Sequence, residues 1–534
     1  MYPLFLHRPL PSAQPELQPT MPSLLGIDSG LTVTKAVLFD VDGTPLSIAR
    51  RRLAPSMPRA RHVERDLPTF WRATAEAISE ALSTGARPAS DVLAVAPTAH
   101  GDGVYLLDAD RQPLGPGILS LDSRAEDLIA AWRQGSVSSE ALALSGQVPH
   151  ASAPSTLLAW LRQHQPERFA RIAHVLACKD WLRHCLTGTI GTDRTEASTA
   201  FTDVRTQRYS DRVLALFGLS ALSTALPPVD HSAALIGEIT PEAAAATGLR
   251  PGTPVAAGLH DVTASALGIG AHVPGVLGVI AGTYSINEIV SDSPRVDSGW
   301  FCRNAIEPGR WNSMAISPAS TANYDWFIDT LCASERDRAS QAGETIHARL
   351  DPEIEAALQR DSTLLFHPYL FGSPHGERAS ASFTGLHGWH ERGDLLRAVL
   401  EGVAFNHRTH IDALRRGFQV RDVRLTGGVS RNPAFAQLFC DTIGLPVQVP
   451  DIDEAAARGA ALCAGVAAGV YPSLQQAPPL ADGSVRLHRP DPHRQARLER
   501  RFELFTRIAE TLRGHWSELE ALGAPAATDE TEPS

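Results

Sequence analysis

The sequence predicts an α/β protein with two domains, from its length and from a local pattern that occurs twice. At 534 residues the chain is long enough for two or more domains of ordinary size, each with its own core. An apolar strand followed by a turn of glycine and hydroxyl residues occurs at residues 24–34 and again at 276–285. This recurrence indicates two related halves, with a boundary at Pro274 and Gly275.

We therefore expect a first domain at residues 23–273, a second at 274–485, and a helical segment at 486–522. Residues 1–22 contain six prolines and only a brief apolar stretch, so we interpret them as a disordered extension. The alternative is that the start codon is assigned too early and that Met21 is the true first residue. Residues 523–534 are expected to form a disordered polar tail.

The charge and cysteine content favour a small-molecule partner over nucleic acid or a membrane. Lysine and arginine number 48 against 59 aspartate and glutamate, which gives a formal net charge of −11, and no basic block is present. No apolar run approaches the roughly 20 residues that span a bilayer. The six cysteines form no CxxC pair, which argues against a zinc site or a disulfide framework and fits a reducing cytoplasm.

The first turn of interest joins two predicted strands, at residues 24–27 and 36–39, in a β-hairpin. The connecting sequence SGLTVTK offers a glycine, three hydroxyl groups and a lysine within a few residues. Such a loop can present N–H and hydroxyl groups to a phosphate, although most turns of this composition bind nothing.

A helix is expected at residues 68–85 and a strand at 91–96, and this strand leads to His100 and Gly101. A lone histidine is more often structural, but one beside a glycine at a strand end is well placed to face a ligand.

Asp122 and Arg124 lie in a second polar segment, SLDSR, for which the alternative interpretation is a local ion pair on the surface. Helices are expected at residues 154–186, 395–408 and 455–470, and a turn-rich connection is expected at 192–203.

Asp261 lies within the segment AGLHDVTASALGIGA, between a predicted strand at residues 255–258 and a small-residue helix at 262–267. In an open α/β sheet, a carboxylate at a strand-to-helix junction faces the crevice where ligands bind. The alternative is that Asp261 only caps the helix.

The second half contains two similar junctions. A strand at residues 276–280 leads into AGTYS, and a strand at 423–425 leads into a Gly-Gly turn at 426–430. Asn432 and Pro433 then open a helix, because Asn is a preferred N-cap and Pro is preferred at the first helical position. Two glycines before a helix allow a flat ligand to approach the backbone closely, but they also occur in ordinary βα turns.

Together these segments resemble the FGGY family of carbohydrate kinases over about residues 24–469. Eight motifs occur in the family's order: GIDSGLTVTKAVLFD, AHGDGVYLLDADRQPL, KDWLRHCLTGTIGTDRTEAS, AGLHDVTASALGIGA, IAGTYS, HPYLFGSPHGERASASFTGL, RAVLEGVAF and TGGVSRNPAFAQLFCDTIGLPV. The resemblance implies the two-domain actin-like ATPase fold, which is ribonuclease H-like and has a deep central cleft.

The resemblance also implies roles for individual residues. Asp261 matches the base that takes the proton from the sugar hydroxyl, and Asp28 matches the acid near the metal ion and the γ-phosphate. The implied nucleotide-binding residues are Thr32, Thr34 and Lys35 in the first turn, Gly282 and Thr283 in the second, and Gly428 and Asn432 at the adenosine. The implied sugar-binding residues are His100, Asp122, Arg124 and Asp261.

The sequence departs from the family pattern at five positions. Leu31 and Val33 stand where Thr and Ser are usual, so fewer hydroxyl contacts to phosphate are expected. Lys35 is a point charge where some members carry an arginine fork. Ala99 replaces a usual Met or Arg, and Ser120 replaces an aromatic residue, and both changes fall in the sugar region.

The activity that the resemblance implies is ATP- and Mg²⁺-dependent phosphorylation of a small ketose. The His100-Gly101 pair is similar to the ketopentose kinases, whereas glycerol kinases carry Arg-Glu there. A pentulose such as xylulose is therefore expected, with a four- or five-carbon polyol such as erythritol as the alternative. An actin-like ATPase without a sugar substrate and a non-catalytic sugar sensor are alternatives of other classes. Whether the chain forms a homodimer is left open.

Overall fold

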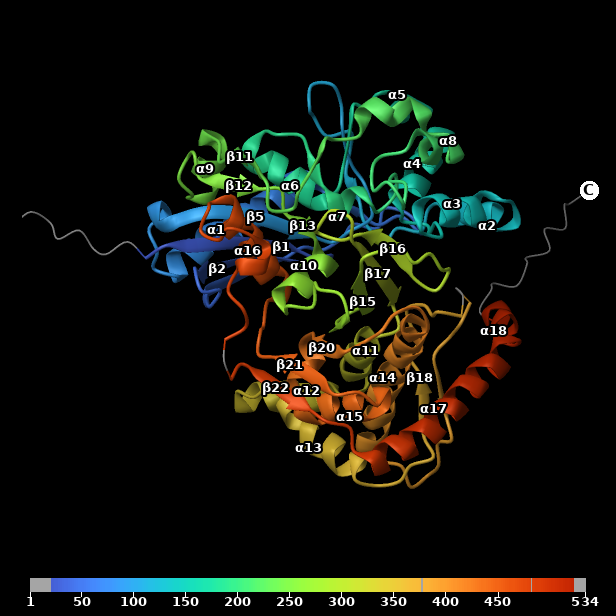
Figure 1. The fold of residues 1–534 in the computed structure, drawn as a ribbon. Coiled ribbons are helices and arrows are strands. Elements are labelled where there is room, and N and C mark those ends of the chain that lie inside the picture. The colour runs from blue at the N-terminus through green and yellow to red at the C-terminus, as the bar shows by residue number, and fades with distance from the viewer. Residues whose placement is uncertain (1–20, 376–377, 482, 523–534) are drawn as a thin grey trace, which may run out of the picture.

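The computed structural model describes residues 21–375, 378–481 and 483–522, so nearly all of the expected extension and all of the expected tail lie outside the described residues. The described chain forms two lobes, each built around a seven-stranded sheet (Figure 1). The first sheet lies in the upper lobe of that view, and the second sheet lies in the lower lobe.

The first sheet has the strand order β11-β12-β5-β1-β2-β3, with β13 paired to β5. Its strands are β1 (Ser23–Ser29), β2 (Val33–Asp40), β3 (Pro45–Arg52), β5 (Val92–Ala99), β11 (Leu235–Glu238), β12 (Pro254–Ala256) and β13 (Leu259–His260). The second sheet has the order β16-β17-β15-β14-β20-β21-β22. Its strands are β14 (Val276–Ala281), β15 (Ser285–Ser291), β16 (Phe301–Asn304), β17 (Trp311–Ser317), β20 (Asp422–Thr426), β21 (Val447–Pro450) and β22 (Val485–His488).

The two sheets share one topology. In the first sheet β1 runs antiparallel to β2 and parallel to β5, and β2 continues antiparallel to β3. In the second sheet β14 runs antiparallel to β15 and parallel to β20, and β15 continues antiparallel to β17. The expectation of two related halves is therefore confirmed, because each half opens with the same hairpin and then crosses over to a parallel strand.

Helices pack against both faces of the first sheet, in two separate hydrophobic clusters. Those of the first lobe are α1 (Leu67–Thr84), α2 (Glu126–Gln134), α3 (Val137–Ser145), α4 (Pro154–His164), α5 (Pro166–Ala170), α6 (Cys178–Thr187), α7 (Arg194–Ala197), α8 (Asp211–Leu216), α9 (Pro241–Thr247) and α10 (Asp261–Gly268). Those that follow β17 are α11 (Ala322–Leu331), α12 (Ala333–Ala342), α13 (Ile346–Leu358), α14 (Arg392–Gly417), α15 (Pro433–Ile443), α16 (Ala455–Ala467), α17 (Pro492–Arg513) and α18 (Trp516–Leu522).

Eight further segments of the described chain pair in four short two-stranded ladders. These ladders are β4 (Glu64–Arg65) with β7 (Gly117–Ile118), β6 (Tyr105–Leu107) with β8 (His174–Leu176), β9 (Thr192–Asp193) with β10 (Val229–Asp230), and β18 (Leu365–His367) with β19 (Ser382–Thr384). Two of them correct the sequence analysis. The strand β8 interrupts the stretch 154–186 that was expected to be helical throughout, and β9 with α7 occupies part of the expected turn-rich connection.

Helix α16 belongs to the second half of the sequence but packs on the first sheet, beside α10 (Figure 1). Glycines allow this contact at backbone distance. A Cβ atom on Gly268 of α10 would lie 1.9 Å from the carbonyl oxygen of Ala455, and one on Gly459 of α16 would lie 2.0 Å from that of Ala264. The small-residue pattern of both helices is thus explained, because larger side chains would force these two helices apart.

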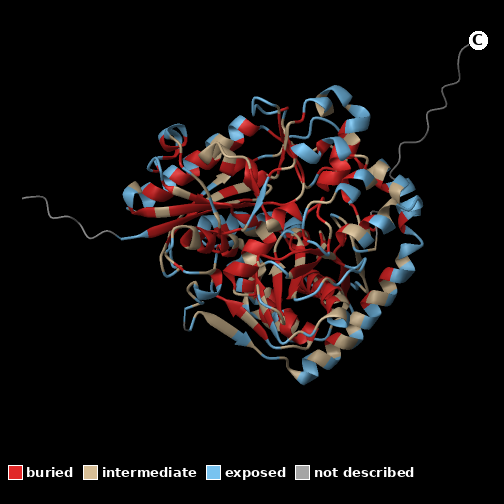
Figure 2. Cartoon of the chain, turned by 45° about the horizontal axis from the view of Figure 1, so that its top comes forward, coloured by how far each residue is buried: buried red, intermediate tan, exposed pale blue. Residues whose placement is uncertain are grey.

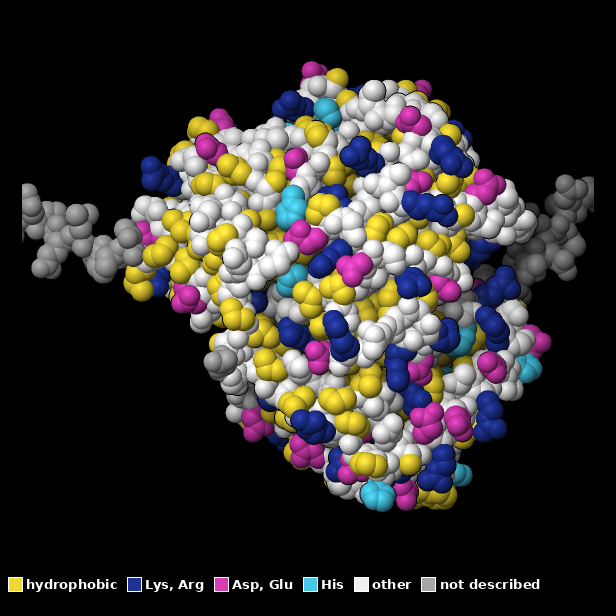
Figure 3. All heavy atoms as spheres, viewed as in Figure 1, with side chains coloured by type: hydrophobic (Ala, Val, Ile, Leu, Met, Phe, Trp, Pro, Cys, Tyr) yellow, Lys and Arg dark blue, Asp and Glu magenta, His cyan; other side chains and the backbone are white. Residues whose placement is uncertain are grey.

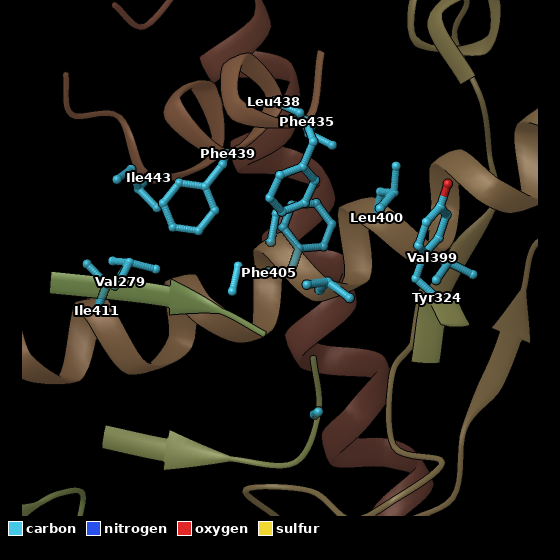
Figure 4. Packing of buried hydrophobic residues seen from close by; sticks show 14 of the residues in the cluster. Val279, Tyr324, Val399, Leu400, Phe405, Ile411, Phe435, Leu438, Phe439 and Ile443 are labelled. Atoms are coloured by element: carbon cyan, nitrogen blue, oxygen red, sulfur yellow. The ribbon is translucent and has the colours of Figure 1, made fainter. Parts of the chain in front are cut away.

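The core of the second lobe lies between its sheet and helices α14 and α15. Phe405 of α14 and Phe435 and Phe439 of α15 point toward one another, with Val279 of β14 beside them (Figure 4). Buried residues fill the middle of both lobes, whereas the outer side of α17 is exposed (Figure 2). Burial of large aromatic side chains contributes most of the packing energy of such a core.

The surface carries charges of both signs. In Figure 3 basic and acidic side chains are interspersed over both lobes, and neither sign dominates this face. Within the described ranges, no helix combines the length and the apolar composition that crossing a membrane requires. All six cysteine thiols are free.

Candidate active site

The first hairpin brings Asp28 and Lys35 opposite each other in the β1–β2 register. The Nζ atom of Lys35 lies 3.5 Å from Oδ2 of Asp28 and 2.8 Å from Oε2 of Glu454, and Arg50 pairs with the other oxygen of Glu454 at 2.5 Å. Burial raises the pKa of Asp28, although the charge of Lys35 opposes that rise. Strand ends thus place an acid and a cation side by side.

The turn between these strands presents Thr32 outward and Thr34 inward. Thr32 is exposed, whereas the Thr34 hydroxyl is buried and shares hydrogen bonds with Ser29 at 2.6 Å and Thr74 at 3.3 Å. The guanidinium of Arg65 donates to the carbonyl of Gly30 at 3.1 Å and fixes the turn from behind. The structure therefore brings Thr32 to the surface of the turn and keeps the Thr34 hydroxyl within the lobe.

Two pockets lie between the lobes, and together we call them the interlobe cleft. The first has an empty volume of about 1030 Å³ and is lined by Asp28, Lys35 and Arg50 on one side and by the Gly427-Gly428 turn on the other. The second, of about 940 Å³, lies between the Thr32 turn and residues of α11, α12 and α13. The expected central cleft is thus present and joins both lobes.

The second glycine-hydroxyl turn, at Gly282 and Thr283, follows β14. Thr321 holds it, because its hydroxyl donates to the carbonyl of Gly282 at 2.7 Å and its backbone N–H donates to the same oxygen at 3.1 Å. The side chain of Thr283 is exposed. A Cβ atom on Gly282 would meet only Ile280, at 3.9 Å, so the turn leaves free space beside its backbone.

The Gly-Gly turn after β20 uses its two glycines differently. Gly427 has φ 112°, and a Cβ atom there would lie 2.2 Å from the carbonyl oxygen of Ala281. A Cβ atom on Gly428 would meet only Arg431, at 3.9 Å. Gly427 is therefore required by the fold, whereas the backbone of Gly428 is open to the cleft.

Asn432 caps helix α15, as the sequence predicts. Its Oδ1 atom accepts from the N–H groups of Ala434 at 2.7 Å and Phe435 at 3.2 Å, with Pro433 at the start of the helix. Its Nδ2 atom donates to Oδ1 of Asp351 in α13 at 2.7 Å. Asn432 thus fixes the Gly428 turn against α13.

Asp261 is the first residue of α10 and lies directly after β13. Its Oδ1 atom accepts from the N–H of Val262 at 2.7 Å. His260, and not Asp261, occupies the N-cap position, so the alternative in which Asp261 is only the helix cap is wrong. The side chain keeps 31% of its surface exposed, and the Asp261 carbonyl accepts from the hydroxyl of Ser265, a residue that lines the cleft, at 2.9 Å. Burial raises the pKa of Asp261 to about 7, and the negative charge of Asp28 adds to the rise.

A chain of polar contacts leads from Asp261 across the lobes. His260 Nδ1 lies 3.5 Å from Oδ1 of Asp261, and His260 Nε2 lies 3.4 Å from Nη1 of Arg303 in β16. Arg303 Nη2 donates to Oδ1 of Asp102 at 3.1 Å, and Arg303 Nε donates to Oε1 of Gln147 at 2.7 Å. One residue of the second lobe thus connects three polar groups of the first.

The segment Gly101-Asp102-Gly103 has an unusual backbone. Asp102 has φ 56°, in the left-handed region that few residues other than glycine adopt. A Cβ atom on Gly101 would lie 1.8 Å from Nε2 of His260, so only glycine fits there. Backbone strain of this kind is typical of functional sites.

His100 lies at the end of β5, as expected, but both its ring nitrogens have protein partners. Nδ1 lies 3.1 Å from the carbonyl oxygen of Gly101, and Nε2 lies 3.2 Å from the hydroxyl of Tyr105. Burial lowers the pKa of His100 to about 3, so the ring is neutral near pH 7. Its contact with a sugar stays a prediction.

Asp122 and Arg124 form an ion pair with each other, through Nε–Oδ1 and Nη2–Oδ2 contacts of 2.8 Å each. Arg124 also donates to Glu64 at 2.7 Å, and Asp122 accepts from the N–H of Val63 at 2.7 Å. The pair is only 2% and 5% exposed, so the alternative of a surface pair is wrong. None of these contacts joins the pair to Asp261, and its role in sugar binding stays a prediction.

The arrangement can perform transfer to a hydroxyl group. It has a carboxylate with a pKa near neutrality, one helical turn before Ser265, which lines the cleft. It also has two turns of the second lobe with open backbone, at Gly282 and Gly428, and a second acid beside a lysine. General bases work best when their pKa lies near the working pH. Sequence reasoning missed Asp102, Gln147, His260 and Arg303, and only the glycines around Asp102 offered a local signal.

Both halves of the chain match known protein families. A family model described as the N-terminal domain of the FGGY family of carbohydrate kinases matches residues 23–268, and the C-terminal domain model of the same family matches residues 277–468. The crystal structure of xylulose kinase from Rhodospirillum rubrum aligns with a TM-score of 0.79 at 28% identity, over 93% of this chain and 100% of that chain.

Two curated relatives cover most of the chain. The L-xylulose/3-keto-L-gulonate kinase of Escherichia coli (strain K12) is 30% identical over 494 residues, which are 92% of this chain and 97% of that protein. The erythritol kinase of Brucella abortus (strain 2308) is 30% identical over 468 residues, which are 84% of this chain and 88% of that protein.

Proposed function

The chain belongs to the FGGY family of carbohydrate kinases, and from this premise we propose that it transfers the γ-phosphate of ATP to a hydroxyl group of a pentulose such as xylulose. As a sugar kinase it is a phosphotransferase with an alcohol as acceptor. The observation that carries the proposal is the carboxylate of Asp261, which has a pKa of about 7, is 31% exposed and lies one helical turn before Ser265 in the wall of the interlobe cleft.

Asp261 is the proposed general base. Proton removal from a sugar hydroxyl requires a carboxylate that is ionised yet basic enough to accept the proton, and a pKa near 7 satisfies both conditions. Phosphoryl transfer otherwise depends on positioning the two substrates in line. Closure of the two lobes around both substrates would exclude water that would otherwise hydrolyse ATP.

The nucleotide is proposed to lie across the cleft, with its adenosine beside the open backbone of Gly428. The proposed contacts are Thr32, Thr34 and Lys35 in the first lobe and Gly282, Thr283, Gly428 and Asn432 in the second. Gly428 lines the cleft, and a Cβ atom on Gly428 or Gly282 would meet no atom closer than 3.9 Å, so the open backbone at both turns supports this placement of the nucleotide.

Asp28 is the proposed holder of Mg²⁺. No group of three potential metal-binding side chains occurs among the described residues, and this fits an ion that is held by one or two carboxylates together with substrate phosphates. When bound, Mg²⁺ offsets the negative charge on the transferring phosphoryl group. Lys35, beside Asp28, would hold a phosphate oxygen on the same side.

The sugar is proposed to lie against His100, Asp122, Arg124 and Asp261, with Asp102 and Arg303 as further candidates. The names of the Escherichia coli and Rhodospirillum rubrum relatives both include xylulose, which supports a pentulose. The Brucella abortus relative, at the same 30% identity, supports erythritol as the second candidate. A reducing cytoplasm is the proposed setting, because all six thiols are free.

A panel of ketopentoses, tetritols, pentitols and glycerol in a coupled ADP-release assay tests this proposal. We expect a pentulose to give the highest kcat/KM and ADP release to stay low without a sugar. Glycerol as the best substrate would contradict the pentulose assignment. ADP release that no sugar or polyol stimulates would favour the actin-like ATPase alternative instead.

A further inference from the structure

Residues 257–260 lead directly into Asp261, and a polar group from another segment holds the backbone of each of them. The groups that hold these four residues are, in order, Arg183 Nη1, the Ser232 carbonyl, the Thr98 hydroxyl and the Thr195 hydroxyl, at 3.2, 3.0, 2.7 and 3.0 Å. The last of these contacts is the nearest to Asp261 in the chain, because it engages the N–H of His260. The backbone that carries the proposed base is therefore fixed from several sides.

Thr195 in α7 is buried, and its hydroxyl links His260 to a buried carboxylate. It donates to Oδ2 of Asp193 at 2.7 Å and accepts from the N–H of His260 at 3.0 Å. Asp193 is fully buried beside Lys179, at 3.0 Å. Although burial opposes it, the charge of Lys179 lowers the pKa of Asp193, so this carboxylate is ionised at neutral pH and only accepts. The hydroxyl proton of Thr195 therefore goes to Asp193, which leaves a lone pair for His260.

Asp193 also fixes the place of that hydroxyl. Its Oδ2 atom accepts from the N–H of Thr195 at 2.9 Å and from the hydroxyl of Ser232 at 2.7 Å. Ser232 in turn accepts through its carbonyl from the N–H of Gly258. One buried carboxylate thus reaches the segment before Asp261 by two routes, through Thr195 to His260 and through Ser232 to Gly258.

The second lobe holds α7 from another side. The Nδ2 atom of Asn304 in β16 donates to the carbonyl of Arg194 at 3.2 Å, and the N–H of Asn304 donates to the hydroxyl of Ser198 at 3.0 Å. Helix α7 is therefore bonded both to the residue before the base and to the opposite lobe. A helix held in this way keeps the Thr195 hydroxyl in one place.

We propose that Thr195, held by Asp193, is a positioning residue for Asp261 and acts through the N–H of His260. This inference rests on the proposed function, since it concerns the base of the same reaction. A base must lie within hydrogen-bond reach of the sugar hydroxyl, and a displacement of about 1 Å can lower the rate by about a hundredfold. Loss of the Thr195 hydroxyl should therefore affect kcat and leave the binding of ATP unchanged.

Thr195→Val removes the hydroxyl and keeps the shape of the side chain, whereas Thr195→Ser keeps the hydroxyl. Thr247→Val is the matched control, because Thr247 is equally buried and its hydroxyl also accepts from a backbone N–H, that of Leu249 at 3.2 Å. Thr247 belongs to α9 and is not among the residues of the cleft. The control thus reproduces the loss of a buried hydroxyl without the link to the base.

We expect kcat with xylulose, at saturating ATP and Mg²⁺, to fall about tenfold to a hundredfold in Thr195→Val, while KM for ATP stays unchanged. Thr195→Ser should stay within about threefold of the wild type, because serine can make the same two hydrogen bonds. Thr247→Val should lower the melting temperature as much as Thr195→Val does and keep kcat. Hydrogen exchange at the His260 amide should be faster in Thr195→Val alone, and this measurement needs no substrate.

A folded Thr195→Val variant with kcat within about threefold of the wild type would overturn the inference, and so would a loss of kcat that Thr195→Ser or Thr247→Val shares. If Thr195→Val fails to fold, Thr195→Ala is compared with Thr195→Ser under the same limits. Unchanged exchange at the His260 amide in the variant that lacks the hydroxyl would also overturn it. The proposed function fails separately, if the wild type phosphorylates neither ketoses nor polyols.

Discussion

The Nδ1 atom of His260 lies 3.5 Å from Oδ1 of Asp261. Since Arg303 can only donate, its contact with His260 Nε2 places the proton of a neutral ring on Nδ1, where it faces the Asp261 carboxylate. Burial and the charge of Arg303 lower the pKa of His260 to about 4, so the ring carries no charge near pH 7. The Nδ1–H group thus lies near the proposed base without a hydrogen bond to it, and the ring adds no positive charge that would lower the pKa of Asp261.

Asp261→Asn should lower turnover by about 10² to 10⁴ and leave ATP affinity nearly unchanged, because the amide keeps the shape but cannot accept a proton. The measurements are kcat with xylulose and the dissociation constant of ATP. Asp211→Asn is the matched control, because Asp211 is also the first residue of a helix, α8, but is exposed and is not among the residues of the cleft. A variant that keeps more than roughly a tenth of wild-type turnover would show that Asp261 is not the base.

The pH dependence of kcat/KM should show a limb with a midpoint near 7. The pKa of Asp261 is raised, so the carboxyl is protonated below pH 7 and activity falls there about tenfold per pH unit. His260→Asn should keep this midpoint, because the neutral ring contributes no charge to it. A flat profile between pH 5 and 9, or a limb that disappears in His260→Asn, would assign the titration to another group.

Gly428→Val should raise KM for ATP more than tenfold and leave the melting temperature unchanged, because its side chain would extend into open space that the nucleotide needs. Gly427→Val should instead destabilise the protein, since Gly427 has φ 112° and its Cβ would meet the Ala281 carbonyl. Thermal unfolding and KM for both substrates separate the two effects. A Gly428→Val variant that changes KM only for the sugar would place the nucleotide elsewhere.

Thr321→Val should raise KM for ATP several-fold with a loss of about 1 kcal/mol in stability, because it removes the hydroxyl that holds the Gly282 carbonyl. Thr409→Val is the control, since its hydroxyl bonds to the Phe405 carbonyl within α14 and not to a turn. Steady-state kinetics at varied ATP, with denaturant unfolding of both variants, measure the effect. Equal KM values in the two variants would mean that Thr321 does not position the turn.

Arg124→Ala should lower the free energy of unfolding by about 3–5 kcal/mol, because it leaves the buried carboxylate of Asp122 without its partner. Arg61→Ala is the control, since Arg61 forms an exposed ion pair with Asp127 and should cost about 1 kcal/mol or less. Denaturant unfolding checks both values. An Arg124→Ala variant with full stability and a raised KM for the sugar would support direct sugar binding by Arg124.

The sequence by itself determined the elements and the junctions between them. Strand patterns predicted the hairpin of β1 and β2, the Asn432 and Pro433 signals predicted the start of α15, and the strand-to-helix junction placed Asp261 at an edge of the sheet. These features depend on side-chain periodicity, capping and turn chemistry, which act over a few residues. The boundary error at β8 has the same origin, because a three-residue strand is too short to show a period.

Only the tertiary structure decided which distant residues share the site. Arg303 meets Asp102 across 201 positions of sequence, and Glu454 meets Lys35 across 419, and no local pattern encodes either pair. Both contacts depend on how the second half of the chain docks on the first, through Arg303 of β16 and through α16 on the first sheet. That docking follows from close packing of whole helices and sheets. The ion pair between Arg303 and Asp102 therefore forms only when the two lobes come together.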